Sequence, residues 1–414
     1  MTIKESVDEQ QLKQTHQALY NELDFNCQYS SNLPAIFKQL NISVAFTSYQ
    51  AGRLMLLRSD GEKLDVNFKS FARPMGLSVT EQGLTLGIFT QVMQFQREDG
   101  LLAQIKKPLQ KIEEDVTAPR IKPKELADVA LPVSEVSDDK NEGLAKQKIY
   151  EESLYQPVDE RVDACFITRA SHYTGMINVH DIAWGDEGLW AVNSSFSCLC
   201  TLEPDYSFVP HWKPHFIDEL KPEDRCHLNG MTLRDGKPAH VTTFSTFNEV
   251  GQWRKSKEFN GTLMDVASNE ILVDGLAMPH SPRWYRDKVY FCNSGHGQVC
   301  SYDPQTKKVE VIVEVPGFTR GMAFYGQFLL VGLSKVRASD VTRPAPLAKK
   351  YAETFSGVWL INLADNSIVG SVSFTGNVDQ IYDVAVLAGC SFPEIIEPTH
   401  PRMRNHFCYP PLQD

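Results

Sequence analysis

Val44-Ala45-Phe46-Thr47-Ser48 near the start of the chain and Ile381-Tyr382-Asp383-Val384 near its end decide the fold, because together they form one repeat. Elsewhere the repeat is continuous: a turn and a first strand are followed, a short way along, by a second strand ending in Ser or Thr. The other openings are Pro74-Met75-Gly76-Leu77, His180-Asp181-Ile182-Ala183, Leu228-Asn229-Gly230-Met231, His280-Ser281-Pro282-Arg283 and Thr319-Arg320-Gly321-Met322. Repeats of about 40–50 residues with several short strands are typical of propeller blades. A repeat split between the termini indicates a ring closed by pairing the N-terminal strands with the C-terminal strand. We predict an all-β, six-bladed β-propeller.

The repeats divide the chain into three parts. We expect an N-terminal helical segment at residues 1–41, the propeller at 42–390 and an extended, proline-containing tail at 391–414. Within the first part, residues 12–23 have helical spacing, and Asn32-Leu33-Pro34 is expected to begin a short helix through Leu40. Residues 106–148 are rich in Lys, Glu, Asp and Pro and poor in aromatics, which is the composition of a flexible insertion, here in blade one.

Composition and charge limit the classes of function. The 414 residues carry a net charge of −11, which argues against nucleic acid or an anionic membrane as the main partner, since both require a basic surface. No apolar run approaches the roughly 18 residues of a membrane span, and the first residues lack the apolar segment of a secretory signal. The nine cysteines are scattered, which favours reduced thiols in a cytoplasmic protein.

One face of the predicted ring collects polar side chains. The innermost strands of a propeller all run in the same direction, so the start of every first strand and the end of every second strand lie on one face. At one register there we place Met75, His180, Asn229, Ser281, Arg320 and Tyr382, with Arg73, His227, His280 and Thr319 one or two positions earlier. His296 follows the second strand of blade four. The segments 246–260 and 335–356 leave from the same face, and we expect them to cover the mouth or to contact a protein partner.

Three histidines suggest a metal centre. His180, His227 and His280 come from consecutive blades, and three His ligands with an open position are a usual arrangement for Zn²⁺ or another first-row metal such as Fe, Mn or Cu. We therefore predict a divalent transition metal that activates water or polarises a carbonyl. Two other interpretations stay open: a His-lined pocket without metal, and histidines that only bond loop backbone.

We expect the remaining polar residues at this mouth to bind the substrate or to act as a base. Arg320 would hold a carboxylate or phosphate of the substrate, and Tyr382 or Asp383 would act as base. The expected substrate-binding residues are Arg73, Asn229, Ser281 and His296. The hydroxyls that end the second strands recur at one register, which favours caps or bonds to a neighbouring blade over a set of nucleophiles; they are Ser48, Thr90, Ser194, Ser245, Ser294 and Ser334.

Several motifs resemble an uncharacterised, mainly bacterial family of conserved hypothetical propeller proteins. They are Ser48-Tyr49-Gln50-Ala51-Gly52-Arg53-Leu54, Arg73-Pro74-Met75-Gly76-Leu77, Val179-His180-Asp181-Ile182-Ala183, Glu223-Asp224-Arg225-Cys226-His227-Leu228-Asn229-Gly230, Met278-Pro279-His280-Ser281-Pro282-Arg283-Trp284-Tyr285 and Tyr382-Asp383-Val384-Ala385-Val386-Leu387. The resemblance covers about residues 42–390 and implies the fold but no reaction. More loosely, a six-bladed propeller with three His around a metal resembles the lyase that completes peptide amidation. Lactonase-type hydrolases of this fold use Glu, Asn and Asp, and no Glu is evident at this mouth.

The sequence therefore favours a metal-dependent enzyme of hydrolase or lyase type, acting on a small or peptidic anionic substrate. The alternative is a non-catalytic propeller that binds a peptide or protein with the same face.

Overall fold

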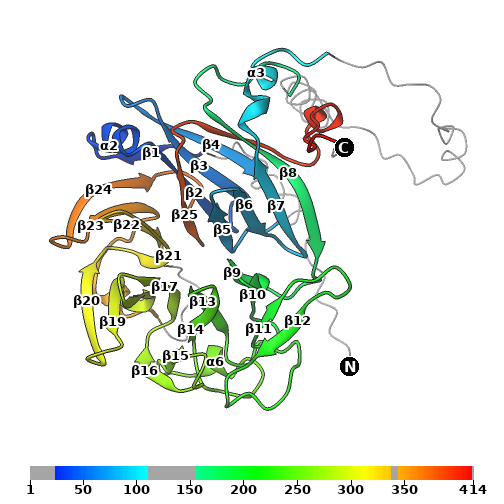
Figure 1. Cartoon of the computed structure of the whole chain (residues 1–414). Coiled ribbons are helices and arrows are strands. Elements are labelled where there is room, and N and C mark those ends of the chain that lie inside the picture. The colour runs from blue at the N-terminus through cyan, green and yellow to red at the C-terminus, as the bar shows by residue number, and fades with distance from the viewer. Residues whose placement is uncertain (1–23, 111–153, 337–343, 413–414) are drawn as a thin grey trace, which may run out of the picture. The chain divides into compact units, whose positions relative to one another are not determined.

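The computed structural model describes residues 24–110, 154–336 and 344–412. Six small sheets stand in a ring and form a six-bladed β-propeller, as predicted (Figure 1). The chain divides into two compact units, one with residues up to Gln94 and Arg169–Ser391, the other with Phe95–Thr168 and the residues from Phe392 onward. The helix expected at 12–23 lies outside the described residues, as does the expected insertion beyond Gln110. No helix in the described ranges has the length and apolar character needed to cross a membrane.

Four blades are each continuous along the chain. Blade two contains β9 (Val179–Gly185), β10 (Gly188–Asn193), β11 (Cys198–Thr201) and β12 (Val209–Trp212). Blade three contains β13 (Leu228–Arg234), β14 (Lys237–Thr243), β15 (Gly261–Asp265) and β16 (Ile271–Leu276), with the short helix α6 (Gln252–Lys255) between β14 and β15. Blade four contains β17 (Pro279–Tyr285), β18 (Lys288–Asn293), β19 (Gln298–Asp303) and β20 (Lys308–Glu314), with the 3₁₀ turn η2 (Ser294–His296). Blade five contains β21 (Phe318–Tyr325), β22 (Phe328–Ser334), β23 (Gly357–Asn362) and β24 (Ser367–Phe374), with α7 (Leu347–Lys350); β1 (Cys27–Tyr29) extends its outer edge.

The ring closes as the split repeat predicts. β25 (Val384–Ala388) pairs antiparallel with β2 (Ile42–Ser48), from Phe46 opposite Val384 to Ile42 opposite Ala388. β3 (Arg53–Ser59) and β4 (Leu64–Ser70) complete blade six in the order β25-β2-β3-β4. The expected helix α2 (Leu33–Leu40) precedes β2 and buries Leu33 and Phe37 against the core of this blade.

Blade one is built from the strands β5 (Leu77–Thr80), β6 (Gly83–Gly87), β7 (Gln91–Arg97), β8 (Ala164–Tyr173) and β26 (Pro393–Ile396). The second unit holds η1 (Asp99–Leu101), α3 (Leu102–Ile105) and η3 (Pro401–Arg404). The expectation of a merely extended tail is wrong here, because Pro393–Ile396 pairs in parallel with Ala164–Ile167. The physical reason is apolar burial: Phe392 and Ile396 pack with Ile105 and Ile167.

The six inner strands contact one another in a closed circle, in the order β5, β9, β13, β17, β21, β25 and back to β5. The pairing of β9, β13, β17 and β21 with their second strands slips by one residue near the start, which is a β-bulge. Such a bulge turns a side chain away from the regular alternation. In this protein it directs Asp181 toward the ring axis.

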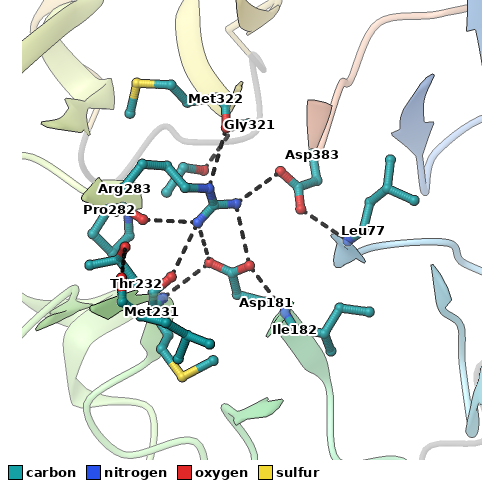
Figure 2. Close-up of polar contacts among 12 residues, drawn as sticks. Leu77, Asp181, Ile182, Met231, Thr232, Pro282, Arg283, Gly321, Met322 and Asp383 are labelled. Carbon is teal, nitrogen blue, oxygen red and sulfur yellow. Dashed lines mark hydrogen bonds and ion pairs between the residues drawn. The ribbon is translucent and has the colours of Figure 1, made fainter. Parts of the chain in front are cut away.

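A single guanidinium on the axis links all six blades (Figure 2). Arg283 of β17 donates to Asp181 at 2.7 Å and to Asp383 at 3.3 Å. It also donates to the carbonyl oxygens of Met231 on β13, at 3.2 Å, and Met322 on β21, at 3.3 Å. Asp383 accepts the N–H of Leu77 on β5 at 3.0 Å, which brings in blade one. We call Asp181, Arg283 and Asp383 the axial network.

The two carboxylates share one cation in a buried place. Burial raises the pKa of Asp383 to about 7; the like charge of Asp181 adds to the shift and Arg283 opposes it. Burial works against the charged guanidinium as well, but Asp181 and Asp383 outweigh it and raise the pKa of Arg283. Arg283 is therefore charged at any pH at which the protein folds.

Glycines occupy every second blade at the position of Asp181 and Asp383. The position that holds Asp181, Ser281 and Asp383 in blades two, four and six holds Gly76, Gly230 and Gly321 in blades one, three and five. A Cβ on Gly230 would lie 2.4 Å from Pro282 Cδ, and one on Gly321 would lie 2.6 Å from the backbone nitrogen of Val384. The glycines thus give the next blade room to approach the axis.

Three of the six hydroxyls predicted at the ends of the second strands, Ser194, Ser294 and Ser334, join neighbouring blades, and those of Ser48 and Ser245 accept local N–H groups. Ser294 donates to the carbonyl of Thr319 at 2.6 Å, and Ser334 donates to that of Ile381 at 2.9 Å. Ser194 donates to Leu228 in the same way. In blade six the residue is Thr47, one position before the expected Ser48, and it donates to Met75 at 2.6 Å.

Arg283→Met should destabilise the protein by about 3–5 kcal/mol, because it leaves two buried carboxylates without their counter-ion. Urea unfolding at neutral pH measures the loss. The control is Lys288→Met, which removes an exposed pair with Glu310 at 3.7 Å and should cost about 0–1 kcal/mol. Equal losses in the two variants would contradict a central role for the axial network.

Gly321→Ala should lower the free energy of unfolding more than Gly326→Ala does. Comparing the two variants distinguishes the effect of crowding from that of backbone strain. Both glycines have positive φ, 70° and 58°, but only Gly321 would bring its Cβ against another blade, whereas Gly326 faces open space. We expect about 1 kcal/mol for Gly326→Ala from conformation alone and about 1–3 kcal/mol more for Gly321→Ala. Thermal unfolding of both variants tests this, and equal shifts in Tm would show that the close approach is unimportant.

Candidate functional site

Two of the predicted histidines are held by the same local backbone motif. Asn178 and Met278, two positions before His180 and His280, both have a φ of 52°. Their carbonyls accept a hydrogen bond from the histidine Nδ1, at 2.8 Å for His180 and 2.9 Å for His280. Since a carbonyl can only accept, each Nδ1 carries the proton, and Nε2 of the neutral ring remains an acceptor.

This motif corrects the alignment of blade four. It places His280 at the register of His180, where the sequence analysis placed Ser281. The hydroxyl of Ser281 instead accepts the N–H of Gly321 at 3.0 Å, between blades. The left-handed conformation of Met278 gives no signal in the sequence, because it is uncommon for residues other than Gly, Asn and Asp.

His280 orients an arginine from the next blade. Its Nε2 accepts the Nε–H of Arg320 at 3.0 Å, while its Nδ1 also reaches the hydroxyl of Ser294 at 2.8 Å. The guanidinium carbon of Arg320 lies 4.4 Å from the ring centre of Tyr382 and 5.6 Å from that of Tyr49, as in cation–π contacts. Within the described ranges, the terminal nitrogens of Arg320 have no hydrogen-bond partner.

His227 is held differently, by a carboxylate and an indole. Its backbone is left-handed, with a φ of 52°, and its Nδ1 lies 2.8 Å from Oδ1 of Asp224. Trp253 of α6 stacks on the imidazole with a centroid distance of 4.2 Å and also donates its Nε1–H to the Asp224 carbonyl at 3.0 Å. Arg254 pairs with the second Asp224 oxygen at 3.0 Å. The segment 246–260 thus covers one side of His227, as expected.

His180, His227, His280, Arg320 and Tyr382 form one group, of which Arg320 is half-buried and the rest are buried. With the buried Asn229, which occupies the same register in blade three, we call them the mouth cluster. The rings of His180 and His227 meet edge to face at 4.8 Å, and those of His180 and Tyr382 at 5.5 Å. His180, His280 and Tyr382 are 6%, 2% and 4% exposed. The structure therefore brings the three predicted histidines, Arg320 and Tyr382 together.

Burial decides the charges in the mouth cluster. Burial, and then the neighbouring His227, holds the pKa of His180 well below its usual range. Burial, and then Arg320, does the same to the pKa of His280. Burial also raises the pKa of Tyr382 well above its usual range, so its hydroxyl keeps its proton. For Asp224, burial works against ionisation, but His227 outweighs it and lowers the pKa.

Two polar groups of the mouth cluster are buried without a partner among the described residues. They are the hydroxyl of Tyr382 and the amide nitrogen of Asn229. Buried polar groups in folded proteins are almost always hydrogen-bonded, so each exception calls for an explanation. Together with the terminal nitrogens of Arg320, these atoms are hydrogen-bond donors.

The predicted three-His metal centre does not fit this arrangement as it stands. Nε2 of His280 is already bonded to Arg320, and a metal ion would have to displace that bond. In the part of the chain that the structure describes, no group of three or more His, Cys, Asp or Glu side chains could hold a metal ion. The metal centre stays a prediction from the sequence.

Other predicted site residues lie elsewhere. Asp383 belongs to the axial network, where it accepts the N–H groups of Leu77 and Val384. Arg73 is exposed and left-handed, with a φ of 50°. His296 is exposed in η2, near Glu314. The segment 335–356 lies partly outside the described residues.

Sequence reasoning missed Asp224, Trp253 and Tyr49 as neighbours of the mouth cluster. Asp224 lies three residues before His227, and that spacing was the available signal. The single Trp of the segment 246–260 was another. Tyr49 gave no signal of its own, because its contact with Tyr382 joins opposite ends of the chain.

The chain belongs to the family described as a domain of unknown function (DUF4915), whose profile matches residues 31–122 and 143–396. The comparison with curated proteins finds no match. Among solved structures, a chain of "Crystal structure of Nidogen/Laminin Complex" is similar with a TM-score of 0.44 and 8% identity, over 84% of this chain and 99% of that one.

Tyr382→Phe should leave the free energy of unfolding unchanged or raise it by up to about 1 kcal/mol, because it removes a buried hydroxyl that lacks a partner. The ring contacts with His180 and Arg320 stay in place. Tyr290→Phe is a suitable comparison, since this tyrosine is also buried but lies in the core between blades four and five. A loss above about 1 kcal/mol in Tyr382→Phe would show that the hydroxyl is satisfied in the folded protein.

Proposed function

We propose that this member of the DUF4915 family binds the anionic group of a small or peptidic substrate in the mouth cluster and acts on it as an enzyme of hydrolase or lyase type. One observation carries the proposal: three groups of the mouth cluster that can donate hydrogen bonds have no partner among the described residues, namely the terminal nitrogens of Arg320, the hydroxyl of Tyr382 and the amide of Asn229. Carboxylate and phosphate oxygens are acceptors, and a guanidinium fork matches their geometry.

The charge distribution supports an anion. His180 and His280 are neutral for the reasons given above, and Asp224 is paired with His227 and Arg254. Arg320 therefore supplies the uncompensated charge of the mouth cluster. His280 and the face of Tyr382 fix the guanidinium before a ligand arrives, which lowers the entropy cost of binding.

His227 is the group best placed for acid–base chemistry on a bound ligand. Asp224 holds its Nδ1, so Nε2 is available to take a proton from a ligand or from water and to return it to a leaving group. The carboxylate stabilises the imidazolium formed in between. Trp253 fixes the plane of the ring from the other side.

A non-catalytic module remains the second candidate, favoured by the contact of α6 with the mouth cluster. A peptide carboxylate would use the same donors, and Trp253 and the exposed Arg254 would form part of the contact surface. The two candidates differ at His227. His227→Gln should abolish turnover in an enzyme while binding persists, whereas a binding module has no turnover to lose.

Arg320→Gln should weaken the binding of an anionic probe at least about tenfold, because it removes the only cation of the mouth cluster. The probes are phosphate, sulfate, succinate and citrate, titrated calorimetrically against the full chain. Tyr382→Phe should weaken the same probe by about threefold to tenfold through loss of one donor.

Arg286→Gln is the matched control, since this arginine contacts the carbonyl of Gly326 outside the mouth cluster. It should bind the probe like the wild type. Failure of all four anions to bind the wild type, or equal weakening by Arg286→Gln, would overturn the proposal.

Elemental analysis of purified, untagged protein should find no first-row metal near one per chain, because Arg320 occupies the nitrogen of His280 that a metal would need. Wild type is measured beside His180→Ala and His280→Ala, before and after incubation with Zn²⁺, Fe²⁺, Mn²⁺ and Cu²⁺. About one metal per chain in the wild type, lost in both variants, would instead establish the three-His centre.

A further inference from the structure

A cavity lies on the ring axis beyond the axial network. It has a volume of about 460 Å³ and is lined by residues of all six inner strands, while none of the mouth-cluster residues lines it. Asp181 and Arg283 belong to its lining, so it reaches the axial network, and it runs along the inner strands to their C-terminal residues, such as Tyr285. Pockets of about 300–1,000 Å³ are the usual size for small ligands.

The wall is mostly aliphatic and contains four aromatic side chains, Trp184, Trp284, Tyr285 and Phe324. Trp184 is 41% exposed, yet its Nε1–H is held by the Thr85 hydroxyl at 2.9 Å, so it offers its face and not its donor. Trp284 and Tyr285 are already engaged within the protein. Trp284 lies parallel to His240, with centroids 5.9 Å apart, and has the guanidinium carbon of Arg234 4.5 Å from its ring centre. Tyr285 stacks on Phe324 at 4.3 Å and has that of Arg286 at 5.2 Å. The exposed face of Trp184 is therefore the one a ligand can stack on.

The charges of this cavity are already neutralised. Among the lining residues only Asp181 and Arg283 are charged, and they pair with each other at 2.7 Å. Every nitrogen of that guanidinium donates within the protein. An anionic ligand would therefore lose its hydration without gaining a counter-ion, which favours an uncharged occupant over an anion.

The wall nevertheless offers many hydrogen-bonding groups. Each inner strand is the terminal strand of its sheet, so one edge of its backbone carries N–H and C=O groups outside the sheet ladder. Ser78 and Thr80 add hydroxyls to the lining, whereas that of Thr232 is already bonded to the N–H of Trp284 and to the carbonyl of Leu233. The edge backbone groups that the axial network does not use lie with these hydroxyls near the exposed Trp184.

We propose that this axial cavity binds a carbohydrate ring. A sugar is uncharged, each hydroxyl both donates and accepts, and the C–H face of the ring packs against an indole. The site goes beyond the proposed function, because it shares no residue with the mouth cluster.

Saturation-transfer NMR with the full chain tests the site. The probes are glucose, galactose, N-acetylglucosamine, maltose and cellobiose, with indole as an uncharged aromatic comparison. At least one sugar should bind the wild type, and Trp184→Ala should weaken it about tenfold or more through loss of the stacking face. Ala323→Leu, which places a larger side chain in the lining, should also weaken binding without removing an aromatic group.

Two control variants test whether the sugar binds in the axial cavity and not at another aromatic ring or in the mouth cluster. Tyr206→Ala removes an aromatic ring that is 63% exposed and does not line the cavity, so it should leave sugar binding unchanged. Tyr382→Phe alters only the mouth cluster and should also bind sugar normally. No sugar bound by the wild type, binding of indole alone, or undiminished sugar binding in Trp184→Ala would overturn the proposal.

Discussion

One guanidinium against two carboxylates on the ring axis is the interaction on which the rest of the structure depends. Arg283 and its partners touch the inner strands of all six blades, whose main contacts are otherwise with their neighbours. A buried ion group of this kind contributes little net stability compared with an apolar core, but breaking it is costly. Its contribution here is geometric, because it requires every blade to reach the same point on the axis.

The axial network fixes the positions of the mouth-cluster residues. His180 directly precedes Asp181, and Tyr382 directly precedes Asp383, so hydrogen bonds that fix the carboxylates also fix the backbone of the site residues. Arg320 precedes Gly321 in the same way, and that glycine lies against Asp383. A site built next to rigid contacts is preorganised without needing strong contacts of its own.

The sequence predicts the architecture well because the architecture is repeated. The split repeat is sufficient to predict ring closure, and the recurrent hydroxyls predict the bonds between blades. The predicted register of blade four is wrong by one residue, since a left-handed methionine such as Met278 cannot be recognised from the sequence. The role of Arg283 is missed although a signal exists: the corresponding positions in the other blades hold small residues, Ser78, Ala183, Thr232, Ala323 and Ala385. Which distant residues pair with that arginine depends on the closed ring and cannot be read from local spacing.

The mouth cluster carries energetic costs of its own. Left-handed backbone at His227 and Met278 costs about 1 kcal/mol or more at each position, and the buried donors of Tyr382 and Asn229 add the cost of lost hydration. On the other side of the axial network, the aromatic rings of the axial cavity lie in relaxed stacking contacts. Left-handed backbone and buried donors without partners do not help a scaffold to fold. Stability alone therefore does not account for the mouth cluster. A ligand that accepts hydrogen bonds from those donors does account for it, because its binding would remove the cost that the unoccupied site bears.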